Sequence, residues 1–141
     1  MTRALIFLGA LALFACDGDS ERNEANLLLT RLEAIRSDDL GEWRRKVDSL
    51  EAMPLEFEGN EDVRDKCHAM HDALLRAEEA TAEARSMMDR LEAGEEGDPA
   101  TVAEALARSE AAIAETRELR QPCESARAEL RTRFASQREG Q

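Results

Sequence analysis

Residues of the types that line helix–helix seams recur at helical spacing over most of the chain. The longest such stripe takes alternating steps of four and three residues through Val63, Cys67, Met70, Leu74, Ala77, Thr81, Ala84, Met88 and Leu91. This heptad pattern predicts a helix that buries one narrow seam against a second helix. Asn60 is a suitable N-cap, and Gly94 and Gly97 should end the helix near residue 92, giving a length of about 50 Å.

A second stripe predicts the partner helix, which opens with Asp98 as a cap and Pro99 at the first helical position. Its predicted seam is Val102, Leu106, Ser109, Ile113, Thr116 and Leu119, and it continues as Cys123, Ala126, Leu130 and Phe134. Pro122 lacks an amide proton and crowds the carbonyl four residues back. We therefore expect a kink at Pro122 or a break into a fourth helix.

Two shorter stripes precede the long ones and are out of phase by about one residue. They are Leu28, Leu32 and Ile35, followed by Leu40, Trp43, Val47 and Leu50. The Ser37-Asp38-Asp39 segment at the mismatch can cap a restarted helix, so we expect either two helices or one kinked helix. Pro54 should close this region, and residues 54–59 should form a connection. The polar residues 17–24 suggest a short tether.

Together these patterns predict an all-α fold: an elongated antiparallel helical hairpin with an additional N-terminal helical segment, over residues 25–138. Past residue 16, only about a fifth of the residues are Val, Ile, Leu, Met, Phe or Trp. A compact globule of this size would normally hold a fuller core. Long helices joined through narrow seams need less apolar surface, which favours a three- to four-helix bundle of elongated, coiled-coil character.

Residues 1–15 have the parts of a signal peptide: a basic start, an apolar run and a small residue before Cys16. The run is shorter than the ~20 residues of a membrane-spanning helix. The segment Leu13-Phe14-Ala15-Cys16 resembles the lipobox of bacterial lipoproteins. The resemblance implies cleavage by signal peptidase II, acylation of Cys16 with fatty acids such as palmitate, and anchoring to a membrane facing the periplasm. Asp17 resembles the inner-membrane retention signal of enteric bacteria; under other sorting rules the outer membrane is expected.

Cys67 and Cys123 lie at nearly equal distances from a turn at residues 94–97, so an antiparallel hairpin brings them face to face. The space outside the cytoplasmic membrane is oxidising, and we therefore predict a disulfide between them. Closing this loop should stabilise the fold by about 4 kcal/mol in the chain-entropy model.

The formal net charge of −12 disfavours nucleic acid as a partner, because the chain should repel phosphate backbones. The sequence has no phosphate-binding glycine loop and no G-x-S-x-G segment, so we expect neither an enzyme nor a cofactor. The leading hypothesis is a non-enzymatic protein-interaction module of the cell envelope, a scaffold or adaptor. Alternatives are a pilotin-like lipoprotein that assists a secretin, an immunity-type lipoprotein, and a periplasmic metal-binding or metal-sensing protein.

Three clusters offer candidate chemistry. His68 and His71 are weak candidates for metal ligands, and the simpler interpretation is a pair of exposed histidines on the helix surface. The basic Trp43-Arg44-Arg45-Lys46 segment could contact anionic lipid headgroups. It also fits a solvated helix face with Trp43 buried and four-apart pairs Glu42–Lys46 and Arg44–Asp48.

The acidic residues Glu92, Glu95, Glu96 and Asp98 could hold Ca²⁺ loosely, but a hydrated turn is the simpler interpretation.

Overall fold

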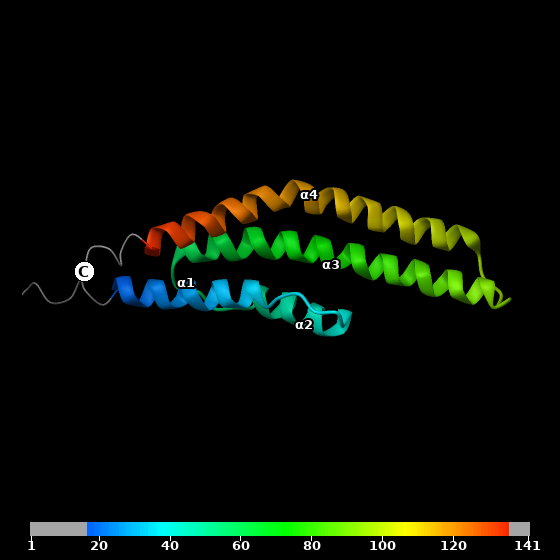
Figure 1. The fold of residues 1–141 in the computed structure, drawn as a ribbon, viewed down its shortest axis with the longest axis horizontal. Coiled ribbons are helices and arrows are strands. Elements are labelled where there is room, and N and C mark those ends of the chain that lie inside the picture. Colours follow the sequence, from blue (N-terminus) through cyan, green and yellow to red (C-terminus); the bar gives the residue numbers. More distant parts are fainter. Residues whose placement is uncertain (1–16, 136–141) are drawn as a thin grey trace, which may run out of the picture.

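The computed structural model describes residues 17–135, which form four helices and no strand. The helices are α1 (Asp17–Glu33), α2 (Leu40–Glu51), α3 (Glu58–Glu92) and α4 (Pro99–Ala135). Figure 1 shows α3 and α4 as a long antiparallel hairpin, with α3 lying between α4 and the two shorter helices. The predicted all-α hairpin with an N-terminal helical segment is confirmed. The leader and Cys16 lie outside the described residues.

The N-terminal segment consists of two helices, which resolves the alternative left open by the sequence. The Asp39 side chain caps α2 by accepting a hydrogen bond from the Glu42 amide. The tether predicted at 17–24 is wrong, because helix α1 already begins at Asp17. Contacts with distant parts of the chain hold this polar stretch, such as the ion pair of Glu21 with Arg133 (3.1 Å).

Helix α3 begins earlier than the predicted cap, Asn60. Its N-cap is Phe57, which has no side chain able to accept a hydrogen bond. The Glu24 carboxylate of α1 instead binds the residues that lead into α3, accepting hydrogen bonds from the amides of Glu56 (2.8 Å) and Phe57 (3.3 Å). A negative charge at a helix N-terminus also interacts favourably with the helix dipole. Asn60 is fully buried within α3 and donates to Glu24 Oε1 (2.9 Å).

The turn between the long helices follows the predicted chemistry. Gly94 adopts φ +78°, and its amide donates to the Leu91 carbonyl while the Glu95 amide donates to the Arg90 carbonyl. This pair of hydrogen bonds is a Schellman motif, in which glycine avoids the steric cost of a left-handed conformation. Asp98 then caps α4 by accepting from the Ala100 amide (2.9 Å).

Helix α4 passes through Pro122 without a break, so the predicted alternative of a separate helix beginning there is wrong. Figure 1 shows α4 changing direction near its middle, consistent with the predicted kink. Proline removes one hydrogen bond and displaces the preceding turn, and packing against α3 on both sides of Pro122 keeps the helix continuous.

The predicted disulfide between Cys67 and Cys123 is confirmed, with the two Cα atoms 4.7 Å apart. The predicted seam of α4 is partly wrong. Leu106 and Ile113 are exposed, while the small residues Ala105 and Ala112 are buried against α3. Alanine lets two helices approach closely, whereas Leu and Ile at the centre of the seam would force them apart.

The core is unequally distributed along the hairpin. The large cluster lies at the end where α1 and α2 pack, and it includes both cysteines together with Leu28, Trp43 and Leu130. Near the turn there is only a small cluster of Ala84, Val102 and Ala105, with Met87 and Leu91 packed against it. We call the first part the proximal end and the part of the hairpin beyond α1 and α2 the distal end.

Removal of the disulfide should destabilise the whole domain. The bond closes a sequence separation of 56 residues, so replacing Cys67 and Cys123 by alanine should lower the free energy of unfolding by about 4 kcal/mol. Urea denaturation of the variant and of the reduced wild type measures this loss. An unfolding midpoint unaffected by reductant would contradict the result, as would reaction of both thiols with a maleimide before reduction.

Candidate functional site

Three large apolar side chains are exposed at the distal end of the hairpin. They are Met88 on α3 (42% exposed) and Leu106 and Ile113 on α4 (44% and 39%). We call these three residues the distal face. Single exposed apolar residues are common on protein surfaces. The distal face differs from such isolated residues because each of its residues belongs to a stripe that is buried elsewhere on the same helix.

The burial of α4 repeats every seven residues, which shows that its seam stays on one face along the helix. Its central seam positions Val102, Ser109, Thr116, Cys123 and Leu130 are all buried. The adjoining stripe, four residues further in each heptad, is Leu106, Ile113, Arg120, Arg127 and Phe134. It is exposed at Leu106, half-buried at Arg127 and only 6% exposed at Phe134. One face of α4 therefore loses its cover toward the turn.

Helix α3 shows the same gradient. The stripe Asn60, Cys67, Leu74, Thr81 and Met88 also repeats every seven residues. Asn60 and Cys67 are fully buried, Leu74 and Thr81 are half-buried, and Met88 is exposed. The Thr81 and Ser109 hydroxyls lie 2.8 Å apart across the seam, which pairs this stripe with its partner on α4 near the start of the distal end.

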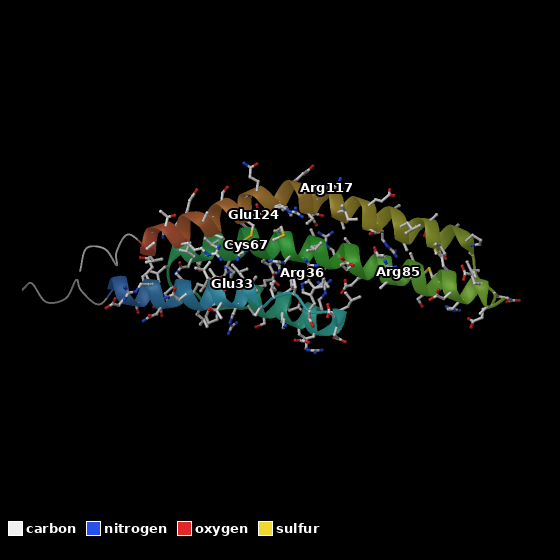
Figure 2. All side chains as sticks on the ribbon, viewed as in Figure 1. Glu33, Arg36, Cys67, Arg85, Arg117 and Glu124 are labelled. Carbon is white, nitrogen blue, oxygen red and sulfur yellow. A yellow bond between two sulfur atoms is a disulfide. The ribbon has the colours of Figure 1, made fainter. Side chains whose placement is uncertain are left out.

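Helix α1 supplies the cover at the proximal end. Its buried residues Ala25, Leu28 and Leu32 pack in the same core cluster as Phe134. Ion pairs of Glu21 with Arg133 and of Glu33 with Arg131 hold α1 along α4. Figure 2 shows Glu33, near the end of α1, well short of Arg85 on the distal part of α3. Helix α2 lies beyond α1 and reaches Glu79 of α3 through Arg44. Past α2, no helix within residues 17–135 covers the groove between α3 and α4 on this side.

The opposite side of the distal seam is bridged by charges. Arg76 pairs with Glu115 (2.8 Å), and Arg108 pairs with Glu83, and both ion pairs join α3 to α4. The hydrogen bond that Arg76 donates to Glu115, followed by the one that it donates to Asp72, raises the pKa of Arg76. Between these pairs lies a shallow hollow of about 400 Å³ with a floor that includes Ala80 and Ala112. The two sides of the distal hairpin thus differ: one is crossed by ion pairs, and the other presents the distal face.

The basic segment 43–46 is divided by the fold. Trp43 is buried, as predicted, and Lys46 forms the predicted pair with Glu42 (2.9 Å). Arg44 does not pair with Asp48. Its guanidinium instead binds Asp72 (2.8 Å) and Glu79 (2.6 Å) and so fastens α2 to α3. The pKa of Arg44 is raised, chiefly by its hydrogen bond with Glu79.

The two histidines of α3 occupy different environments. His68 is half-buried, but His71 is only 6% exposed, and neither of its ring nitrogens has a hydrogen-bond partner among residues 17–135. The interpretation of both as exposed surface histidines is therefore wrong for His71. Burial, reinforced by the nearby positive charges of Arg127, Arg36 and His68, lowers the pKa of His71 to about 4. His71 is thus neutral in the folded protein near pH 7.

Metal-binding side chains do not converge in the part of the chain that the structure describes. No group of three or more His, Cys, Asp or Glu residues there could hold a metal ion. Cys67, the neighbour of the two histidines, is committed to the disulfide. In the acidic turn, Glu95 pairs with Arg90 (2.8 Å), and Glu92, Glu96 and Asp98 are exposed. Within residues 17–135, no helix is long and apolar enough to span a bilayer.

Comparison of the chain with protein-family models, with curated proteins and with solved structures gave no match.

The burial of His71 predicts a pH-dependent loss of stability. An unfolded histidine titrates near 6.5 and the folded one near 4, so the unfolded state binds a proton first as the pH falls. The contribution of neutral His71 to the free energy of unfolding is fully present above pH 6.5 and is lost as the pH falls to 4. The loss amounts to about 3 kcal/mol. Urea denaturation between pH 7 and 4 measures it.

The variant His71→Leu should lose this part of the pH dependence, while the matched variant His68→Gln should keep it. Carboxylates also titrate below pH 5, so the difference between variant and wild type is the relevant quantity. If the unfolding free energies of wild type and His71→Leu fall in parallel, His71 is not buried in its neutral form.

Proposed function

We propose that this protein is a lipid-anchored, non-enzymatic interaction module of the bacterial cell envelope that binds an α-helix of another protein on its distal face. The observation that carries the proposal is the loss of cover along one groove between α3 and α4: α1 and α2 cover the proximal end, and Met88, Leu106 and Ile113 remain exposed where the groove continues. A helix laid in this groove in line with α1 would bury the three side chains.

The occupant should be amphipathic because the groove itself is. Side chains that accompany the distal face at helical spacing carry both signs of charge: Glu78, Arg85, Glu92, Glu110 and Arg117. Helix α1 shows which pattern fits such a groove, since its apolar residues follow three-and-four spacing and its flanks are charged. A partner helix with the same pattern would place an apolar stripe on the distal face and polar residues at its rim.

The proposed anchor would hold the proximal end at a membrane and leave the distal face at the other end of the hairpin. The lipobox resemblance supports acylation of Cys16, which directly precedes the first residue of α1. Two or three acyl chains would hold the protein stably, whereas a single chain binds only marginally. Helix α3 is about 50 Å long, and the turn at Gly94 lies at the end of the hairpin opposite to α1's first residue (Figure 1).

Site-specific photocrosslinking in the native cell tests the proposal. A photoreactive amino acid at Leu106 or Ile113 should give an adduct with a partner protein, because these side chains lie in the groove. The matched control is the same amino acid at Glu118, an exposed position of α4 outside the stripe, which should give none. Met88→Asp combined with the Ile113 probe should abolish the adduct by placing a charge in the apolar contact.

Several outcomes would reject this function. Equal adducts at Leu106 and Glu118 would show contact without a specific groove, and an adduct with a second copy of the chain would show self-association instead of partner binding. A Cys16→Ser variant that still fractionates with membranes would reject the anchor. The mass of a specific adduct identifies the partner and separates a secretin subunit or a toxin from other envelope proteins.

A further inference from the structure

A cationic groove lies between α1 and α2, away from the distal face. It has a volume of about 320 Å³ and is lined by Arg31, Ala34, Glu42, Arg45, Lys46, Ser49 and Leu50. The α2 residues of this set fall at spacings of three and four and so form one stripe of the helix. Helix α1 contributes Arg31, whose Nη1 lies 3.3 Å from the Ser49 hydroxyl.

Two of the three positive side chains in this groove form no salt bridge, whereas most Lys and Arg side chains of residues 17–135 form one. Arg31 donates to the neutral carbonyl and hydroxyl of Ser49 and forms no salt bridge within the described residues. Arg45 likewise forms no salt bridge within residues 17–135, although its charge helps to lower the pKa of Glu42, and it is exposed. Arg44, by contrast, binds two carboxylates. In a chain with net charge −12, two unpaired guanidinium groups at one groove form a local positive site.

Lys46 adds a third positive group, and its carboxylate partner, Glu42, also binds Ser37. Its Nζ lies 2.9 Å from Glu42, and Glu42 also accepts a hydrogen bond from Ser37 (2.9 Å). Lys46 and Ser37 together lower the pKa of Glu42, so this carboxylate stays charged. The groove therefore contains three cations and one anion.

Its floor is apolar. Leu50 is almost completely buried beneath the groove, and Ala34 forms part of the α1 side. A ligand that fits both features carries an anionic group for the arginines and a short apolar portion for the floor. Guanidinium groups match phosphate oxygens well, because they donate parallel hydrogen bonds in one plane.

We propose that the groove formed by Arg31, Arg45 and Lys46 binds a phosphate group carried by an amphipathic molecule. Two sources share this chemistry: an anionic phospholipid headgroup and a free phosphorylated compound. A lipid would place the α1–α2 side of the molecule on the bilayer. The sequence suggested that segment 43–46 contacts lipid headgroups. In the proposed site only Arg45 and Lys46 of that segment would do so, together with Arg31 of α1.

Titration of the purified, processed protein in neutral detergent tests the site. The probes are inorganic phosphate, dihexanoyl phosphatidylglycerol and, as zwitterionic control, dihexanoyl phosphatidylcholine. The readout is the NMR shift of the arginine Nε–H signals, which follows each guanidinium separately. The anionic lipid should shift the signals of Arg31 and Arg45, and the double variant Arg31→Gln/Arg45→Gln should weaken its binding at least about tenfold.

The matched control variant is Arg85→Gln/Arg117→Gln, which removes two exposed arginines of α3 and α4 that form no salt bridge within residues 17–135 (Figure 2) and should leave binding unchanged. The variant Arg31→Lys/Arg45→Lys keeps the charge and should retain most of the binding, which separates loss of the site from loss of the fold. A groove-dependent response to phosphate alone supports a free phosphorylated ligand. Absence of binding, or equal weakening by both glutamine variants, overturns the proposal.

Discussion

The close approach of α3 and α4 along a seam of small side chains is the constraint on which the rest of the structure depends. Ala77, Ala84, Ala105 and Ala112 let the two backbones come together, but each buries little apolar surface. Additional interactions must therefore hold the hairpin. The Cys67–Cys123 disulfide, the α1–α2 layer and the interhelical ion pairs supply them, and most of these lie at the proximal end.

This unequal distribution separates a closed end from an open end within one pair of helices. At the proximal end α3 is covered on two sides, and side chains such as Glu24 and Arg44 connect helices that are distant in sequence. At the distal end the same heptad stripes continue, but Met88, Leu106 and Ile113 have no covering helix. Regions with few buried contacts open more easily and often take part in binding. The fold thus provides a rigid base and a surface suited to a partner.

Local sequence patterns predicted the helices, the turn at Gly94 and the facing cysteines, since heptad spacing, capping and glycine chemistry act over a few residues. Between Val102 and Thr116 the predicted seam of α4 included Leu106 and Ile113 in place of the buried Ala105 and Ala112. Steps of four and three residues can be taken there in either order. Counting back from Leu130 through Cys123 in unbroken alternation leads to Ala112 and Ala105, so the buried cysteine held the missing signal.

Contacts between distant segments could not be predicted in this way. Nothing near Glu24 in the sequence shows that it binds the segment leading into α3, because the amides of Glu56 and Phe57 reach it only after α1 has packed. The partners of Arg44 on α3 and the burial of His71 likewise depend on where α1 and α2 lie. The cationic groove has the same origin, since Arg31 meets Arg45 and Lys46 only across two helices.

Amide hydrogen exchange of the free protein, measured residue by residue, tests most directly whether the hairpin has a closed and an open end. Amides at 63–75 and 119–130 should exchange only through global unfolding. Those at 80–91 and 102–112 should exchange about a hundredfold faster through local opening. Equal protection along both helices would contradict it, because the seam alone would then stabilise the distal end as fully as the proximal one.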